Sequence, residues 1–321
     1  MKIVLSSIIV VTLLLAVGCK KQAREQLGEG ELAGTITMSG AWALYPMAVK
    51  WAEEFQELHP RVRIDVAAGG AGKGMADALA QVADIGNVSR DIYPEEIKKG
   101  AWWVSVTKDA VVPTVNERNP MLAKLLTKGV DRETFIAIWI TGTVENWSEV
   151  IGEAVTEPIH VYTRSDACGA AKTWAKFLDG KQEDLLGVGV YGDPGLAEAV
   201  RNDILGIGFN NINYAYDAKS KAQVEGIKVL PVDLNGNGQI DSEEDFYDSR
   251  HEIVAAIATG RYPSPPARDL HFVCQGRPTR VVVTKFIEWV LTDGQKYVPE
   301  SGYISLTAEK LHEGLKKLEG E

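Results

Sequence analysis

The sequence predicts an α/β protein that is large enough for two lobes. Strand-like and helical segments alternate along the chain, which is the order found in α/β proteins. Three loops, residues 39–46, 69–74 and 164–170, each lead into a helical segment. The chain has 321 residues, of which 45% are hydrophobic, and this composition is that of an ordinary globular protein. Such a length suffices for two domains of usual size.

The periods of the apolar residues place the individual elements, with a period of two for strands and about 3.6 for helices. The expected strands are 35–39, 62–67, 84–87, 103–106, 110–116, 159–162, 206–209, 227–230 and 270–274. The expected helices are 48–58, 74–82, 122–126, 132–139, 170–178, 195–202, 252–259, 279–292 and 308–318. No internal repeat interrupts this order.

The three loops have the chemistry of anion sites. A helix start offers unpaired backbone N–H groups and the positive end of the helix dipole, so it attracts anions without a charged side chain. Arg164 heads the third loop, and Asp166 is its expected ion-pair partner. Two simpler explanations stay open: residues 69–74 as a tight turn with glycines at positive φ, and Arg164 as a surface residue paired to Asp166. Lys73 precedes Gly74 rather than Ser or Thr, so the second loop is not a Walker A loop.

The order of these motifs resembles the phosphate-binding proteins of ABC uptake systems. The resemblance rests on the motifs at 40–46, 69–72, 84–90 and 164–169, with further matches at 143–150, 207–216 and 294–303, and it covers residues 34–315. It implies a two-lobed periplasmic-binding-protein-like fold of type 2, with a hinge and a ligand cleft between the lobes. Lobe one would comprise residues 34–114 and 268–321, and lobe two residues 115–267.

The resemblance also implies a set of oxyanion-binding residues. These are Leu44, Tyr45, Ala71, Gly72, Ser89 or its neighbour Arg90, Arg164, Cys168, Gly169 and Ala170. Hydroxyl side chains common in the family are missing at Leu44, Ala71, Cys168 and Ala170, which leaves mainly backbone donors. Each hydroxyl lost to a charged ligand costs about 1.5–3 kcal/mol, so Trp42, Ser89, Arg90, Lys73 and Tyr45 are candidate replacements. The ligand is therefore phosphate, another tetrahedral oxyanion, or a larger and less polar molecule.

A second site follows from the residues alone. The segment 233–244 fits the EF-hand calcium loop, with glycine at loop position 6 and a hydrophobic residue at position 8. The expected ligands are Asp233, Asn235, Asn237, Gln239 through its carbonyl, Asp241 and Glu244. The segment before it reads as a strand rather than an EF helix, so we expect a structural Ca²⁺ clip of low affinity. The alternative is an acidic Asn-Gly turn.

The first residues read as an export signal. Residues 1–19 combine a lysine, an apolar run too short to span a bilayer, and a sequence at 15–19 that resembles a bacterial lipobox. This predicts lipidation of Cys19 and a flexible tether over 20–33, with an ordinary signal peptide as the alternative. The remaining cysteines, Cys168 and Cys274, are expected to stay unpaired, and Cys168 at a helix start is a candidate for a lowered pKa.

The function predicted from these features is binding rather than catalysis. The net charge of −10 argues against nucleic acid, and the histidines show no metal-ligand spacing or catalytic motif. We expect an extracytoplasmic, lipid-anchored, monomeric protein that captures phosphate or a related oxyanion for an ABC permease and is not an enzyme. The alternative is a surface lipoprotein with a role in sensing or attachment, which uses the same fold and binds calcium.

Overall fold

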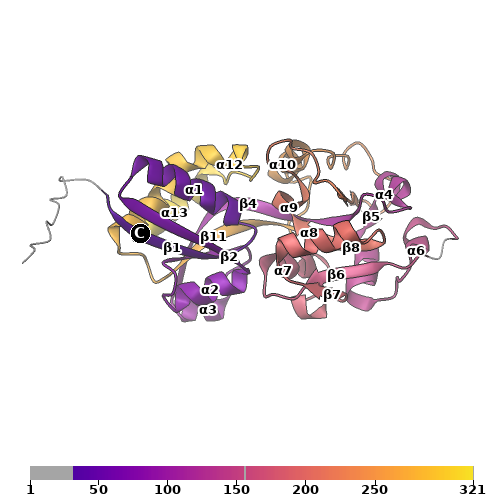
Figure 1. Ribbon diagram of the computed structural model, residues 1–321, viewed down its shortest axis with the longest axis horizontal. Helices are drawn as coiled ribbons and strands as arrows, with labels where there is room; N and C mark the ends of the chain where they lie inside the picture. The colour runs from indigo at the N-terminus through magenta and orange to yellow at the C-terminus, as the bar shows by residue number, and fades with distance from the viewer. Residues whose placement is uncertain (1–31, 155–156, 321) are drawn as a thin grey trace, which may run out of the picture. The chain divides into compact units, whose positions relative to one another are not determined.

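The computed structural model describes residues 32–154 and 157–320, and its α/β architecture confirms the predicted fold class (Figure 1). The main sheet follows the order β2-β1-β3-β11-β4-β8-β6-β7, and β9 also pairs with β4. Its strands are β1 Gly34–Ala41, β2 Val62–Gly69, β3 Ile85–Val88, β4 Ala101–Asn116, β6 His160–Arg164, β7 Val188–Val190, β8 Gly206–Asn211, β9 Ile227–Val229 and β11 Ala267–Gln275. The short strands β5 (Val130–Asp131) and β10 (Val232–Asp233) form a separate parallel pair.

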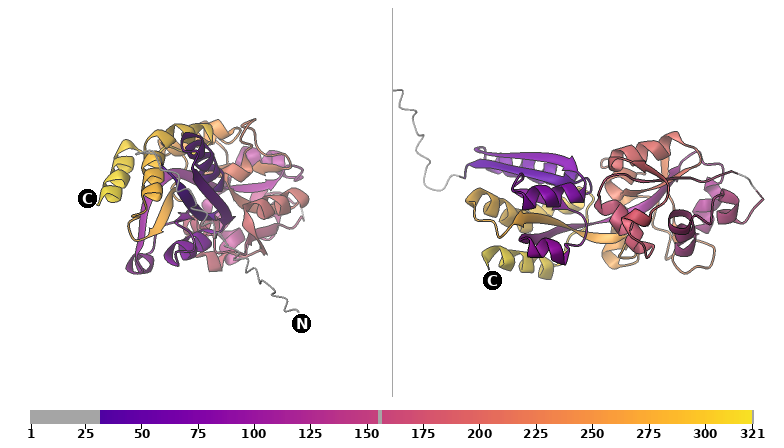
Figure 2. Two further views of the ribbon diagram at one scale, coloured as in Figure 1. Left: turned by 60° about the vertical axis from the view of Figure 1, so that its left-hand side comes forward. Right: turned by 90° about the horizontal axis from the view of Figure 1, so that it is seen from below.

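Helices connect these strands and pack beside the sheet (Figure 2). The α-helices are α1 Tyr45–Leu58, α2 Ala71–Leu79, α3 Pro94–Lys98, α4 Leu122–Lys128, α5 Arg132–Ile136, α6 Trp147–Ile151, α7 Gly169–Phe177, α8 Gly192–Asn202, α9 Ile212–Ala215, α10 Arg250–Thr259, α11 Val281–Leu291, α12 Tyr297–Glu300 and α13 Ala308–Glu319. Three of them, α1, α2 and α7, begin at the loops that the sequence singled out.

Two hydrophobic cores make the protein two-lobed. The first core is built by residues 36–106 and 270–318, and Trp51 packs edge-on against Phe272 within it, with their ring centres 5.7 Å apart. The second core is built by residues 110–267 and Ile304, and Trp174 stacks on Phe209 within it at 5.9 Å. Burial of these large aromatic side chains is a main source of stability in each lobe.

The strand β4 joins the two cores and corrects one expectation. The segments 103–106 and 110–116 are not two strands but parts of the single 16-residue strand β4. Its first part pairs antiparallel with β11 in the first lobe, and its last part pairs with β8 and β9 in the second. Between the two expected segments, Lys108 and Asp109 pair with Asp269 and Arg268 of β11, so the ladder continues through them.

Several helix boundaries also differ from those expected. Helix α1 begins at Tyr45 with Pro46 in its first turn, where proline is favoured because its missing N–H would have no partner. The expected helix 132–139 is the short α5 followed by a π-helix over Ala137–Thr141.

Cys168 and Cys274 are buried and free, which confirms that they do not pair. Within the described residues, no helix is both long and apolar enough to cross a membrane.

Candidate functional site

The first and second loops lie in direct contact in the first lobe. The backbone N–H of Trp42 donates to the carbonyl of Gly69 at 3.1 Å. Gly40 has φ +131° and lies against Gly74, so a Cβ at residue 40 would meet the Gly74 Cα at 2.6 Å. Only glycine permits this approach, which places the starts of α1 and α2 side by side.

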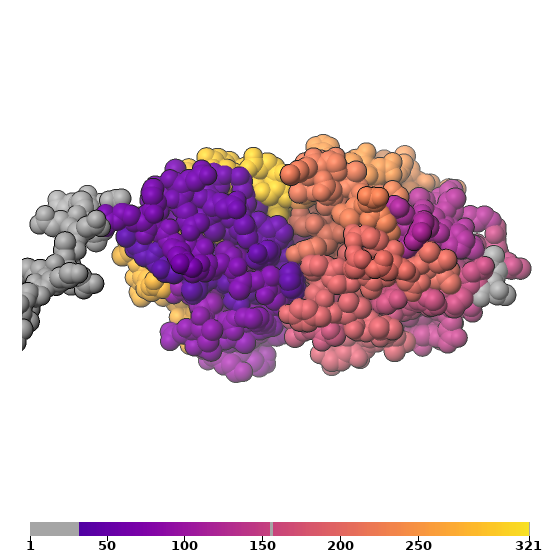
Figure 3. Space-filling model, in the orientation of Figure 1, coloured from indigo at the N-terminus to yellow at the C-terminus, as the bar shows by residue number. Residues whose placement is uncertain are grey.

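The third loop comes from the second lobe and closes against these residues. The N–H of Gly72 in the first turn of α2 donates to the carbonyl of Ala167 at 3.0 Å. Gly169, the first residue of α7, touches Ser89: a Cβ there would lie 2.2 Å from the Ser89 carbonyl oxygen. The structure therefore brings the three predicted loops and Ser89 together at the junction of the lobes. In the space-filling view, the indigo part of the first lobe lies directly against the salmon and orange parts of the second (Figure 3).

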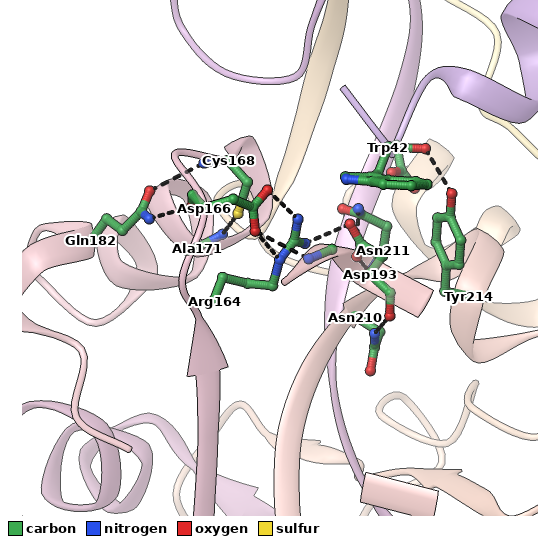
Figure 4. A network of polar contacts seen from close by, with 12 residues as sticks. Trp42, Arg164, Asp166, Cys168, Ala171, Gln182, Asp193, Asn210, Asn211 and Tyr214 are labelled. Carbon is green, nitrogen blue, oxygen red and sulfur yellow. Dashed lines mark hydrogen bonds and ion pairs between the residues drawn. The ribbon is translucent and has the colours of Figure 1, made fainter. Parts of the chain in front are cut away.

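Arg164 lies buried within this junction and is held by two carboxylates (Figure 4). Its Nε and Nη2 atoms donate to Asp166 at 2.8 and 2.7 Å, which confirms the expected ion pair. Its Nη1 atom donates to Asp193 at 2.6 Å. Burial alone would lower the pKa of Arg164, but the negative charges of Asp193 and Asp166 raise it above its usual value. Arg164 is thus always charged, and two N–H groups of its five remain for a ligand.

Asp193 and the third loop are fixed by amide side chains. Oδ1 of Asp193 accepts from the backbone N–H and from Nδ2 of Asn211, the latter at 2.8 Å. Gln182 braces the third loop, since its Nε2 donates to the Asp166 carbonyl at 2.7 Å and its Oε1 accepts from the Cys168 N–H. Tyr214 links the lobes through its hydroxyl, which donates to the Trp42 carbonyl at 3.1 Å. The arginine is therefore rigidly held, with no freedom to swing toward a ligand.

The predicted backbone donors divide into two groups. The N–H groups of Leu44 and Tyr45 already donate to Ala41 and Trp42 within their own turn. Gly72 donates across the junction to Ala167. Ala71, Gly169 and Ala170 lie in the first turns of α2 and α7, where a backbone N–H has no acceptor within its own helix. These last three are the backbone donors best placed to receive an anion.

The candidate replacement donors also divide. Lys73 donates to Ser39 at 2.8 Å and is ion-paired with Asp77. Arg90 forms a bidentate ion pair with Glu96, with N–O distances of 2.6 and 2.8 Å. Trp42 differs from both, because its indole Nε1 is buried without a hydrogen-bond partner. Buried N–H groups are nearly always paired, so this atom is suited to a ligand.

Cys168 is the N-cap of α7, and its environment corrects one expectation. Its sulfur accepts from the N–H of Ala171 at 3.3 Å. Burial raises the pKa of its thiol to about 12, and the nearby Arg164 opposes this effect only in part. The expected lowering of the pKa is wrong because removal from water outweighs the helix dipole and the arginine. Cys168 remains a neutral thiol at physiological pH.

The segment 233–244 folds into a loop around its acidic residues. Asp233 and Glu244 at its two ends are both buried, and Oδ2 of Asp233 accepts from the Gly238 N–H at 2.8 Å. The side-chain amides of Asn235 and Asn237 both donate to Asp241, at 2.9 and 2.8 Å. The N–H of Ile240 donates to the Thr127 carbonyl and so ties the loop to the end of α4.

The oxygen atoms of this loop are of the kind that calcium binds, but in this structure they are not gathered around one point as a coordination shell. Gly236 and Gly238 have φ of +70° and +80°, which allows the tight turns that such a loop needs. In the part of the chain that the structure describes, no three His, Cys, Asp or Glu side chains are gathered as a metal-binding group. The carboxylates here instead accept hydrogen bonds from the loop itself, and cation binding would have to replace some of these.

Sequence reasoning missed the residues that complete the arginine site. The sequence did not indicate Asp193 because this residue lies 29 positions after Arg164. Its one local feature is its place as an acidic residue in the first turn of α8. Asn211 at the end of β8 and Gln182 after α7 carry no motif of their own. Strand ends that meet at one edge of a sheet are the general indication that could have pointed to Asn211.

The fold and the site define a class of protein: a two-lobed α/β solute-binding protein in which helix starts from both lobes meet around a buried arginine. The chain belongs to the PBP superfamily, since residues 26–294 match the PBP superfamily domain. The phosphate-binding protein PstS of Bacillus subtilis (strain 168) is 26% identical over 323 residues, covering 97% of this chain and 96% of that protein. Protein SphX of Synechococcus elongatus is 26% identical over 291 residues, covering 85% and 78%.

Solved structures share the fold. A crystal structure from Clostridium perfringens with bound phosphate, assigned as a phosphate ABC transporter substrate-binding protein, has a TM-score of 0.69 and 21% identity, covering 85% of this chain and 100% of that one. An ABC-type phosphate transport receptor from Vibrio cholerae has a TM-score of 0.61 and 19% identity, covering 84% and 100%. The resemblance and the fold predicted from sequence are confirmed.

Proposed function

We propose that this protein captures phosphate or a related tetrahedral oxyanion outside the cytoplasm and delivers it to an ABC permease. The observation that carries the proposal is the meeting of the α2 and α7 starts around buried Arg164, marked by the bond from Gly72 to Ala167. Helix starts and a fixed guanidinium provide short-range attraction for an anion even in an acidic protein. The names of the relatives and of the solved structures support phosphate as the ligand.

The site would bind its ligand without chemical change. The donors available to an oxyanion are two N–H groups of Arg164, the first-turn amides of Ala71, Gly169 and Ala170, and Nε1 of Trp42. Asp166 and Asp193 already offset the charge of Arg164, so a further anion depends on these hydrogen bonds more than on net charge. The neutral thiol of Cys168 adds no nucleophile.

The test is calorimetric titration of the purified mature chain with phosphate, arsenate, sulfate and molybdate, in the presence of EDTA. We expect one site for phosphate, and its loss in Arg164→Ala with a cost of about 2–5 kcal/mol. Arg277→Ala serves as the matched control, because this arginine bonds the backbone of α13 far from the site. Absence of binding for all four anions would overturn the proposal.

Export and anchoring belong to the same proposal. Cys19 and residues 20–31 lie outside the described residues, and the lipobox-like sequence at 15–19 is the support for a lipidated Cys19. Metabolic labelling with a fatty-acid analogue should mark the wild-type protein and not Cys19→Ser. A soluble, unlabelled wild-type protein would contradict the anchor.

We further propose that the loop 233–244 binds one Ca²⁺ ion as a structural clip, the feature shared with the alternative of a calcium-binding surface lipoprotein. Support comes from the match of the loop sequence to the EF-hand pattern. The carboxylates of Asp233, Asp241 and Glu244 accept hydrogen bonds within this loop, and calcium would take the place of some of these donors. Calcium should raise the melting temperature of the wild type, and Glu244→Gln should abolish the rise. Glu243→Gln is the control, because residue 243 is not at a ligand position. An unchanged melting temperature at millimolar calcium would contradict the clip.

A further inference from the structure

A cavity of about 750 Å³ is lined by residues of both lobes, among them Gln182, which also contacts the third loop of the arginine site. The first lobe contributes Arg90, Lys108 and Arg268 to its walls, and the second lobe contributes Lys172 of α7 and Lys181 of the following loop. Its volume lies within the range of pockets that hold molecules of drug size, and is far more than a single tetrahedral oxyanion needs.

The cavity is basic although the chain as a whole is acidic. Seven lysines and arginines line it against three acidic residues, while the chain carries a net charge of −10. Among the described residues, no carboxylate forms an ion pair with Lys108, Lys172 or Lys181. Burial lowers the pKa of His271 on the same wall to about 4, so this residue is uncharged at neutral pH. A low-dielectric cleft lined by one sign of charge concentrates ligands of the opposite sign.

Two buried arginines in this lining retain unused donors. Arg268 is 8% exposed, and its Nε and Nη1 atoms have no hydrogen-bond partner. Arg90 is 6% exposed, and its Nε also lacks a partner although its other nitrogens bind Glu96. A buried guanidinium with free N–H groups is costly unless a ligand or water completes it. These donors therefore point to an anion in the cavity, independently of the lysines.

The positions of the cations on opposite walls of the cavity indicate which kind of anion fits there. Lys108 and Arg268 lie on β4 and β11, whereas Lys172 and Lys181 lie on the other lobe. Lys176 of the second lobe already pairs with Asp91 of the first at 2.7 Å, which shows that side chains from the two walls approach one another. One compact ion contacts few of these groups at once, whereas several phosphoryl groups on one small molecule can reach both walls.

We propose that this cavity is a second anion site, which binds a small molecule carrying two or more phosphoryl groups. The site is distinct from the junction around Arg164 and does not require orthophosphate to bind there. Its recognition rests on the unpaired N–H groups of Arg90 and Arg268 together with the charges of Lys108, Lys172 and Lys181.

The test is calorimetric titration of the intact mature chain with tripolyphosphate and, separately, with fructose 1,6-bisphosphate, orthophosphate and citrate. The variant Lys108→Gln/Lys172→Gln removes one cation from each wall. Its matched control is Lys219→Gln/Lys316→Gln, which makes the same change in charge at exposed positions away from the cavity. We expect tripolyphosphate to bind the wild type, with affinity at least about tenfold lower in the cavity variant and unchanged in the control. Orthophosphate binding should be the same in all three proteins.

Each contrary result identifies what fails. Absence of tripolyphosphate binding in a wild type that still binds orthophosphate overturns this inference and leaves the proposed function standing. Equal loss in both double variants shows a general charge effect and also overturns it, as does citrate binding as tightly as tripolyphosphate. Binding of the sugar bisphosphate with the same loss in the cavity variant would identify an organic phosphate rather than a condensed one as the ligand.

Discussion

Nη1 of Arg164 lies 2.6 Å from Oδ2 of Asp193, and the side chains of both residues are almost completely buried. Together with Asp166, this gives one buried guanidinium two carboxylate partners. The arginine proposed to hold the anion therefore brings no surplus positive charge. This arrangement favours a rigid site in which hydrogen-bond geometry, more than net charge, selects the ligand.

Replacing Asp193 by asparagine should separate stability from binding. Asp193→Asn removes one counter-charge of Arg164, so we expect phosphate to bind about tenfold more tightly, a gain of about 1.4 kcal/mol. The same change breaks a buried ion pair and should lower the free energy of unfolding by about 3 kcal/mol. Calorimetry and urea unfolding measure the two effects. Weaker phosphate binding in a folded variant would contradict the prediction.

Replacing Trp42 by phenylalanine removes only the unpaired indole N–H while keeping an aromatic ring. If Nε1 donates to the anion, Trp42→Phe should cost about 1.5–3 kcal/mol of phosphate binding and little stability. Trp174→Phe is the control, because its Nε1 is also buried and unpaired but lies in the second core beside Phe209. Equal losses of phosphate affinity in both variants would remove Trp42 from the site.

Adding one methyl group at Gly169 should hold the lobes apart. A Cβ there would lie 2.2 Å from the carbonyl oxygen of Ser89, so the two lobes must shift in Gly169→Ala. We expect at least about a tenfold loss of phosphate affinity and a larger radius of gyration in X-ray scattering. Gly195→Ala in α8 is the control, because its Cβ would meet only a Val190 methyl group, at 3.1 Å. A compact Gly169→Ala with normal affinity would contradict this account.

Asp109 should make stability depend on pH. It is fully buried on β4 beside Arg268, and loss of hydration raises the pKa of its carboxyl to about 7 from an ordinary value near 3.8. Between these values the folded state binds more protons than the unfolded state, so this group lowers stability as pH rises from about 4 to 7. Complete ionisation of Asp109 lowers the free energy of unfolding by roughly 4 kcal/mol relative to low pH.

The variant Asp109→Asn isolates that contribution. Its free energy of unfolding, measured relative to the wild type, should improve steadily from pH 5 to pH 8, because only the wild type must ionise a buried carboxyl over this range. The exposed carboxyl of Asp91 supplies the control variant Asp91→Asn. A difference between wild type and Asp109→Asn that is constant with pH would show that Asp109 does not titrate in this range.

Features that depend on residues close together in the chain could be predicted from the sequence alone. Alternating patterns placed the strands and helices, helix starts followed the three loops, and the spacing of Arg164 and Asp166 predicted their ion pair. Near neighbours have few ways to be arranged, so short-range patterns carry this information. The order of motifs along the chain also gave the family.

Contacts between residues far apart in the chain became known only from the folded structure. It joined the expected strands 103–106 and 110–116 into β4, because β11 pairs across the gap between them. It brought Asp193 to Arg164, turned Arg90 to Glu96, and gathered the cavity lysines from both lobes. These contacts are set by how the two cores pack against the shared sheet, and burial then raised the pKa values of Asp109 and Cys168. No local period in the sequence records such packing, so only the folded chain reveals it.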